Sequence, residues 1–421
     1  MEWLASLCLF FTLFHTLNAG RFQRLSERYS HQRFAHLTFH LLAEVEFIFG
    51  FWAILYLLLC GIFGSFSETI PFLSQLHFSE SVFVVVVMIA AATAPILNTT
   101  QKLIEAFSRQ LPLPQSLATS KVPELFSILV IAPLLGSLIT EPAAMTVAAL
   151  LIHQQILGTK PSQKLLYSTL GTLFVNVSIG GILTSFAAPP VLMVARIWNW
   201  DSHFMFTHFG WKAIIAVILN SAILCRINLK ELKSPHLQEH HRKLSVNPLV
   251  LMMNLGFLII TILNVHHIGV LALIFIALMI YLKLTKKHQG TLRLQSSFFV
   301  GFFLAGLTVL TAEQGWWLKP VLTQFGENAL FIGSTLLTAI TDNAALTSLA
   351  AQVDQLTPLA RYLVVAGAVT GGGLTLIANA PNPAGFSILK ERFGKEGLRP
   401  ATLLKYAMIP TLIAGALLWN H

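Results

Sequence analysis

Apolar stretches of about 20 residues recur along the whole chain, and they constrain the fold more than any other feature. A helix of that length crosses a hydrocarbon core of roughly 30 Å. Only 11% of the residues are charged, whereas an ordinary soluble domain carries about 25%. A soluble body of this size would lack the polar surface it needs, so the pattern predicts an all-α polytopic membrane protein.

Two kinds of apolar segment can be distinguished. Ten stretches are expected to be transmembrane helices: 3–19, 38–63, 81–100, 165–190, 211–228, 247–264, 267–283, 295–311, 360–389 and 402–419. Two others, 122–157 and 329–352, are interrupted in the middle by polar residues. We expect each of these to be a re-entrant hairpin, because non-helical backbone at that depth is tolerated only inside protein or beside a water-filled cavity.

The basic residues indicate how the chain is oriented. The net charge is +9, and 23 of the 27 Lys and Arg residues lie in or beside six loops: 21–36, 101–121, 158–164, 226–246, 284–294 and 390–401. Basic loops are typical of the cytoplasmic side. We therefore expect a bacterial cytoplasmic (inner) membrane protein with its N-terminus outside and no nucleic-acid partner. The first apolar run lacks a basic flank before it, which favours an uncleaved helix over a signal peptide.

Cysteine usage and enzyme motifs add little. The three cysteines, Cys8, Cys60 and Cys225, all lie in apolar segments and predict no disulfide framework. The chain contains no P-loop, no His-Glu-x-x-His and no Gly-x-Ser-x-Gly. We expect no enzymatic activity and no cofactor.

Two blocks of sequence occur twice, in the same order. Residues 134–146 read LLGSLITEPAAMT and residues 335–347 read TLLTAITDNAALT, so Glu141 and Asp342 occupy the same place. Residues 180–190 and 371–381 also match and begin with glycine runs. Five expected spans separate equivalent elements, an odd number, which predicts two repeats of inverted topology. Such repeats with interrupted helices are typical of secondary transporters.

The repeat divides the chain into four segments. These are 1–63 as N-terminal transmembrane helices, 81–228 as the first inverted repeat, 247–294 as linking transmembrane helices, and 295–421 as the second inverted repeat. Each repeat is expected to contain one re-entrant hairpin and one broken transmembrane helix.

The interruptions supply the chemistry. Freed carbonyls and the C-terminal ends of half-helices suit a cation. Hydroxyls and amides near the interruptions add neutral oxygen ligands: Thr140, Thr184, Ser185, Thr341, Thr375, Asn343, Asn379 and Asn382. Glu141 and Asp342 at the hairpin tips would attract Na⁺, Li⁺ or H⁺ and repel an anion. The alternative is that either acid only caps the N-terminus of a half-helix.

A further titratable group lies at the start of the second span. His40 and Glu44 are four residues apart and share a helix face, whereas Glu46 points elsewhere. They are interpreted as a proton relay or pH gate, since His titrates near neutrality; the alternative is a structural ion pair. Glu124, at the start of the first hairpin, is a weaker candidate. The loop with His236, His240 and His241 is interpreted as solvated.

Three segments resemble a known family. HLLAEVEFIFGFWA (40–53), LLGSLITEPAAMTVAALL (134–151) and GGGLTLIANAPNPAG (371–385) look like the sodium/proton antiporter family within the ion-transporter superfamily. The resemblance implies inverted repeats, elevator-like movement of a transport unit against a scaffold, and often a homodimer. Related anion symporters carry Ser-Asn-Thr at the hairpin tips, where this chain has Thr-Glu-Pro and Thr-Asp-Asn, which weakens a dicarboxylate interpretation.

We therefore expect a secondary transporter that exchanges Na⁺ or Li⁺ for H⁺. Two alternatives stay open: a sodium-coupled carrier of a small organic anion, and an intramembrane metal-dependent enzyme built on His40, Glu44 and Glu46. The second alternative is weaker because the three side chains cannot all converge if Glu46 lies off the shared face.

Overall fold

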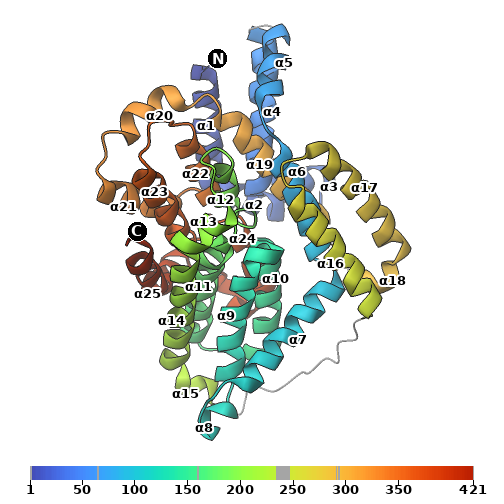
Figure 1. Ribbon diagram of the computed structural model, residues 1–421, viewed down its shortest axis with the longest axis vertical. Coiled ribbons are helices and arrows are strands. Elements are labelled where there is room, and N and C mark those ends of the chain that lie inside the picture. Colours follow the sequence, from blue (N-terminus) through green and yellow to red (C-terminus); the bar gives the residue numbers. More distant parts are fainter. Residues whose placement is uncertain are drawn as a thin grey trace.

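The computed structural model describes residues 2–63, 66–158, 161–233, 247–290, 292 and 294–420, and every regular element within these ranges is a helix (Figure 1). The loop containing His236, His240 and His241 lies outside the described residues.

The expected membrane helices are largely present. Within the described ranges, six helices are long and apolar enough to span a membrane, and the number rises to eight if each of two bent pairs counts as one span. Two further apolar helices, α16 Pro248–Leu263 and α17 Ile268–Leu284, are shorter. The all-helical membrane fold is confirmed, and length and composition support six to eight spans in place of the ten expected.

Two expected spans are interrupted. Residues 38–63 are divided between α3 Arg33–Leu41 and α4 Val45–Phe63. Residues 81–100 are divided between α6 Ser79–Ala91 and α7 Ala94–Gln110. Pro95 explains the second break, since proline has no N–H and favours the first turn of a helix.

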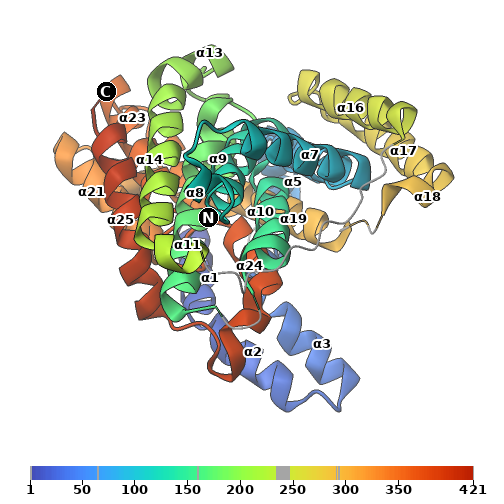
Figure 2. The same ribbon diagram turned by 90° about the horizontal axis from the view of Figure 1, so that it is seen from below.

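The first basic segment was expected to be a loop and is helical instead. α2 Ala19–Arg28 and α3 pack together as a pair (Figure 2). α1 Glu2–Leu17 and α2 meet at a bend of 56°. The sequence of α2 alternates arginines with apolar residues at helical spacing, so the segment forms a surface helix without being apolar enough to span.

The two interrupted apolar stretches each form a pair of helices. α9 Val122–Ile139 meets α10 Glu141–Leu151 at the single residue Thr140, and η1 Ile152–Ile156 continues α10. α21 Glu327–Thr338 and α22 Asn343–Ala351 are joined by residues 339–342. We refer to residue pairs Thr140–Glu141 and Thr341–Asp342 as tip 1 and tip 2.

Each glycine run interrupts a helix. α11 Gln163–Gly180 ends in η2 Gly181–Leu183, and α12 Pro189–Ala195 resumes after a non-helical segment. α23 Pro358–Gly371 likewise stops before α24 Pro381–Leu389. Both restarts begin with proline, as expected of a helix N-terminus.

The two halves pack on each other reciprocally. α10 of the first pair contacts α24, and α22 of the second pair contacts α12. α9 packs on α11, and α21 packs on α23. α14 Trp211–Ile227 and α25 Pro400–Leu418 pack on each other and on α11. Together α9–α12, α14 and α21–α25 form what we call the hairpin group.

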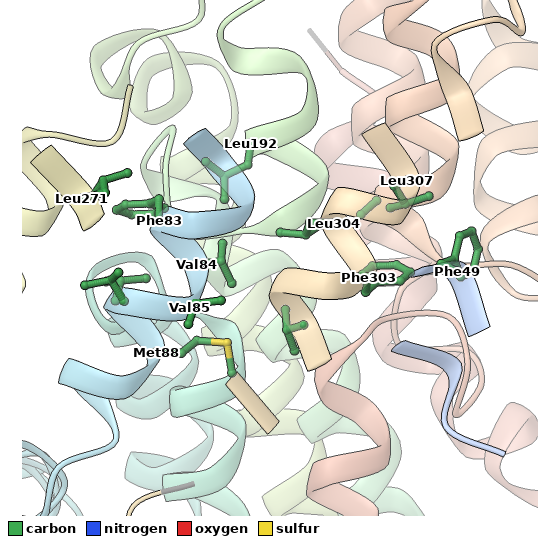
Figure 3. Close-up of a cluster of buried hydrophobic side chains, with 14 of the residues drawn as sticks. Phe49, Phe83, Val84, Val85, Met88, Leu192, Leu271, Phe303, Leu304 and Leu307 are labelled. Carbon is green, nitrogen blue, oxygen red and sulfur yellow. The ribbon is translucent and has the colours of Figure 1, made fainter. Parts of the chain in front are cut away.

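A second set of helices lies beside the hairpin group. This flanking group comprises α1, α4, α6, α16, α17 and α19 Leu294–Thr311, which share one buried apolar cluster. Figure 3 shows Phe83 and Met88 of α6 and Leu304 of α19 within it, together with Leu192 of α12 from the hairpin group. Ile139, Ala143, Ala344 and Ala345 of the hairpin group belong to the same cluster, so buried apolar side chains contribute to the contact between the groups.

Short elements connect these groups. They are α5 Phe66–Gln75, α8 Gln115–Ala118, α13 Ser202–Met205, η3 Phe206–Gly210, α15 Leu229–Leu232, α18 Lys286–Gln289, α20 Gly315–Leu322 and η4 Lys390–Glu396.

Candidate cation site

Tip 1 holds a strained residue beside a buried acid. Thr140 has φ 75° and ψ 152°, a conformation that non-glycine residues adopt at a cost of about 1–3 kcal/mol. Glu141, the next residue, is fully buried. A Cβ on Gly181 would lie 2.5 Å from Cγ and 2.7 Å from Oε1 of Glu141, so the glycine at the helix break makes the space for this side chain.

The Glu141 carboxylate contacts the other repeat. Asn379, from the interruption after α23, donates a 2.9 Å hydrogen bond from Nδ2 to Glu141 Oε2. Glu141 Oε1 has no hydrogen-bond partner. Only one of the two carboxylate oxygens therefore accepts a hydrogen bond, and its donor is a neutral amide.

Tip 2 holds its acid in a different way. Asp342 Oδ1 accepts hydrogen bonds from the N–H groups of Ala344 at 2.7 Å and Ala345 at 3.3 Å. Asp342 thus caps α22, which is the structural role that the sequence left open. These two bonds use one oxygen, and the backbone N–H of Ala380 also interacts with the carboxylate.

Asn343 ties tip 2 to both interrupted helices. Its backbone N–H donates to Ala378 O at 3.1 Å, and its Nδ2 donates to Ser178 Oγ of α11 at 3.4 Å. Each hairpin therefore contacts the interrupted helix of the other repeat: the first through Glu141 and Asn379, and the second through Asn343, the first residue of α22, and Ser178.

A small cavity opens beside Asp342. It is lined by Glu46, Phe303, Asp342, Leu376, Ile377, Asn379, Ala380 and Pro383. Its volume is about 10 Å³, close to the space that one water-sized sphere requires. Asn379 lines this cavity and also bonds Glu141, so it links the two acids.

Oxygen acceptors without donors concentrate around the interruptions. Among the described residues, such buried atoms include Glu141 Oε1, Thr140 Oγ1, Thr338 Oγ1, Asn343 Oδ1, Asn379 Oδ1 and Asn382 Oδ1. A buried acceptor without a partner is costly, and hard cations take oxygen ligands. This set of oxygens fits a cation: the carboxylate and amide oxygens can only accept, and the two hydroxyl oxygens can accept as well as donate.

The other predicted oxygen ligands have structural contacts. Thr184 Oγ1 donates to Ser137 O at 2.7 Å, and Thr375 Oγ1 donates to Ala339 O at 2.8 Å. Asn382 Nδ2 bonds the carbonyls of Gly372 and Thr375 at 2.8 and 2.9 Å, and so closes the interruption.

Two predicted ligands bond groups outside this set of oxygens. Thr341 Oγ1 bonds Leu337 O at 2.9 Å. Ser185 Oγ lies 3.1 Å from Ser202 Oγ of α13.

The group at the start of α4 differs from the prediction. His40 Nδ1 lies 3.6 Å from Glu44 Oε1, but a break separates the two residues, so they do not share one helix face. Burial raises the pKa of Glu44, and His40 partly offsets this. Glu46 lines the Asp342 cavity, which the sequence did not indicate. No cluster of three potential metal ligands occurs in the described part of the chain.

Two further positions complete the comparison with the prediction. Glu124 forms an ion pair with Lys121 at 2.8 Å, three residues away. Ser178 and Gly181 were missed as site residues. Gly181 lies in the repeated glycine block, which was a usable signal, whereas nothing in the sequence marks Ser178.

The helical membrane fold and the oxygen-lined site define a membrane transport protein. The chain belongs to the family described as "Putative Na+/H+ antiporter", whose sequence profile matches residues 1–420. The solved structure of the Alcanivorax borkumensis YdaH transporter, described as having an unusual topology, shares the fold, with a TM-score of 0.50 and 14% identity over 89% of this chain and 96% of that chain. No curated protein matches the chain.

Proposed function

We propose that the protein exchanges Na⁺ or Li⁺ for H⁺ across the bacterial cytoplasmic membrane. One observation carries this proposal: two buried carboxylates, Glu141 and Asp342, lie among buried oxygen acceptors that have no donors. Family membership supports the same class of activity.

The two acids would hold the cation and the proton in turn. A bound cation neutralises a carboxylate as a proton does, so competition for one group couples the two fluxes without contact between the ions. Asn379 joins the acids, because it lines the Asp342 cavity and bonds Glu141. Each bound form must favour a different conformation for coupling to result.

The packing supports an elevator-type cycle. The reciprocal contacts α10–α24 and α12–α22 fit two inverted repeats, each with a re-entrant hairpin and a broken helix. In this proposal the hairpin group moves against the flanking group, past the buried apolar side chains that the two groups share. A homodimer and an external N-terminus belong to the same proposal.

Everted membrane vesicles test the function. A respiration-driven pH gradient is followed with a quenched dye, and Na⁺, Li⁺, K⁺ or a dicarboxylate is added. Dequenching by Na⁺ or Li⁺, but not by K⁺, is the expected result. Dequenching that requires a dicarboxylate would point to an organic-anion carrier, and no response to any of these additions would refute cation/proton exchange.

A further inference from the structure

Two neighbouring spaces share one titratable side chain. The small Asp342 cavity is lined by Glu46 and Pro383, and so is a wider pocket of about 510 Å³. We call the wider pocket the vestibule. It is also lined by Glu44, by the first turns of α19 and by Ala384 and Ser387 of α24. Glu46 therefore lies at the junction between the vestibule and the cavity.

The cavity wall comes from both helix groups. Glu46 is in the first turn of α4 and Phe303 belongs to α19, so the flanking group forms one side. Asp342 and Asn379 of the hairpin group form the other side. Two carboxylates, each on a different group, thus border a space of about 10 Å³.

The ligand chemistry of this space is well defined. Asn379 is fully buried, and its Oδ1 has no hydrogen-bond partner. Carboxylate and amide oxygens bind hard cations, and a space near one water in size fits a single dehydrated ion. A small organic anion would not fit, and two facing carboxylates would repel it.

We propose that Glu46 is a ligand of the transported cation, and that the cation passes Glu46 on its way between the vestibule and Asp342. This inference rests on the proposed function and extends it to the flanking group. A cation between Glu46 and Asp342 would hold the flanking group against the hairpin group. Without a cation or a proton, the two like charges disfavour that arrangement, which would keep the empty carrier from completing its cycle.

Direct cation binding tests the role of Glu46. Purified full-length protein in detergent is titrated with NaCl or LiCl at constant ionic strength, with choline as the balancing cation, and thermal unfolding is recorded. Glu46→Gln preserves the shape and removes the charge. Loss of a charge-assisted contact weakens binding, so the half-saturating Na⁺ concentration is expected to rise by about tenfold or more. Glu44→Gln is the matched control, since Glu44 lines the vestibule but not the cavity, and it should stay within about twofold of wild type.

The outcomes separate this inference from the proposed function. If wild type responds to Na⁺ and Glu46→Gln responds with the same half-saturation, Glu46 is not a ligand, while exchange by the two tips stands. If wild type binds cation but does not move protons in vesicles, the antiport proposal fails and the Glu46 comparison still decides this inference. If wild type shows no cation response, both fail.

A second variant covers the case in which Glu46→Gln does not fold. Glu46→Cys and Glu44→Cys are each treated with a small charged thiol reagent; the native cysteines Cys8, Cys60 and Cys225 are buried. Saturating Na⁺ should slow modification at position 46 severalfold and leave position 44 unchanged. Equal rates with and without Na⁺ at position 46 would overturn the proposal.

Discussion

The two hairpin tips place equivalent acids in different surroundings. Glu141 at tip 1 is sealed: its carboxylate lies against Gly181 and is held by Asn379. Asp342 at tip 2 is capped by its own helix and borders a cavity. The chain thus keeps one acid enclosed behind an amide and the other beside a space that an ion can occupy.

Because of this difference, we expect Glu141 and Asp342 to have unequal roles in cation binding. In the proposed mechanism, an ion that enters from the vestibule reaches Asp342 before Glu141, because Asp342 lines the cavity whereas Glu141 lies behind Asn379. The sequence also pointed to tip 2, because Asn343 follows Asp342 whereas Pro142 follows Glu141. The predictions below test the inequality from its largest expected consequence to its smallest.

Asp342→Asn removes the charge at tip 2 with little change of size. The amide oxygen still accepts the capping bonds, and a neutral amide is cheaper to bury than an acid, so the protein should fold. We expect Na⁺-dependent proton movement in everted vesicles to be lost. Expression and gel-filtration profiles matching wild type are the control. Exchange at the wild-type rate would mean that Asp342 is only a helix cap.

Glu141→Gln tests the enclosed acid. Its neutral oxygen can still accept the bond from Asn379, so the surroundings should persist while one negative charge is lost. Apparent Na⁺ affinity should weaken by about tenfold, with exchange retained at high Na⁺. The measurement is the half-saturating Na⁺ concentration for dequenching. Complete loss in this variant, with activity kept in Asp342→Asn, would reverse the order of the two tips.

Gly181→Ala asks whether the space around Glu141 matters. The new methyl group would overlap Glu141, so the carboxylate must shift, and overpacking of this kind costs about 1–3 kcal/mol. Lower thermal stability and a Na⁺ affinity weaker by roughly threefold are expected. Gly256→Ala is the control, because nothing lies within 4 Å of the added atom. Equal behaviour of the two variants would contradict the close fit.

The sequence predicted the general fold and the tips for clear physical reasons. Apolar length marks membrane helices, and the repeated blocks around Glu141 and Asp342 marked the helix breaks near them. α14 and α25 begin and end within two residues of the expected spans 211–228 and 402–419. Interruptions at residues 42–44 and 92–93 were missed although Glu44 and Pro95 mark them, because each lies inside a longer stretch that was interpreted as a single span.

Contacts across the halves could not be predicted in the same way. Ser178 lies in an apolar helix, and only packing brings it to Asn343. Glu46 was separated from the site because 38–63 was treated as one helix, whereas in the structure a break precedes α4 and Glu46 in its first turn lines the cavity. Ser185 was included because its hydroxyl lies close to the interruption in the sequence, but this hydroxyl lies against Ser202.

The smallest expected effect concerns the vestibule, which adjoins the Asp342 cavity at tip 2. Burial raises the pKa of Glu44, and the nearby His40 lowers it again. His40→Gln removes the lowering influence, so Glu44 should lose its proton at a higher pH than in wild type. Glu46 lines the vestibule together with Glu44. If deprotonation of Glu44 favours the conformational step of the cycle and leaves cation binding unchanged, the midpoint of the pH profile of exchange moves to higher pH in His40→Gln. Glu44→Gln should remove this titration and leave the Na⁺ to Li⁺ preference unchanged.

The His40 side chain is 41% exposed and the Glu44 side chain is 35% exposed, so solvent screening keeps the shift of the pH midpoint small. Unchanged midpoints in both variants would reduce the pair to a surface ion pair, whereas a changed ion preference would place Glu44 in the binding site beside Asp342.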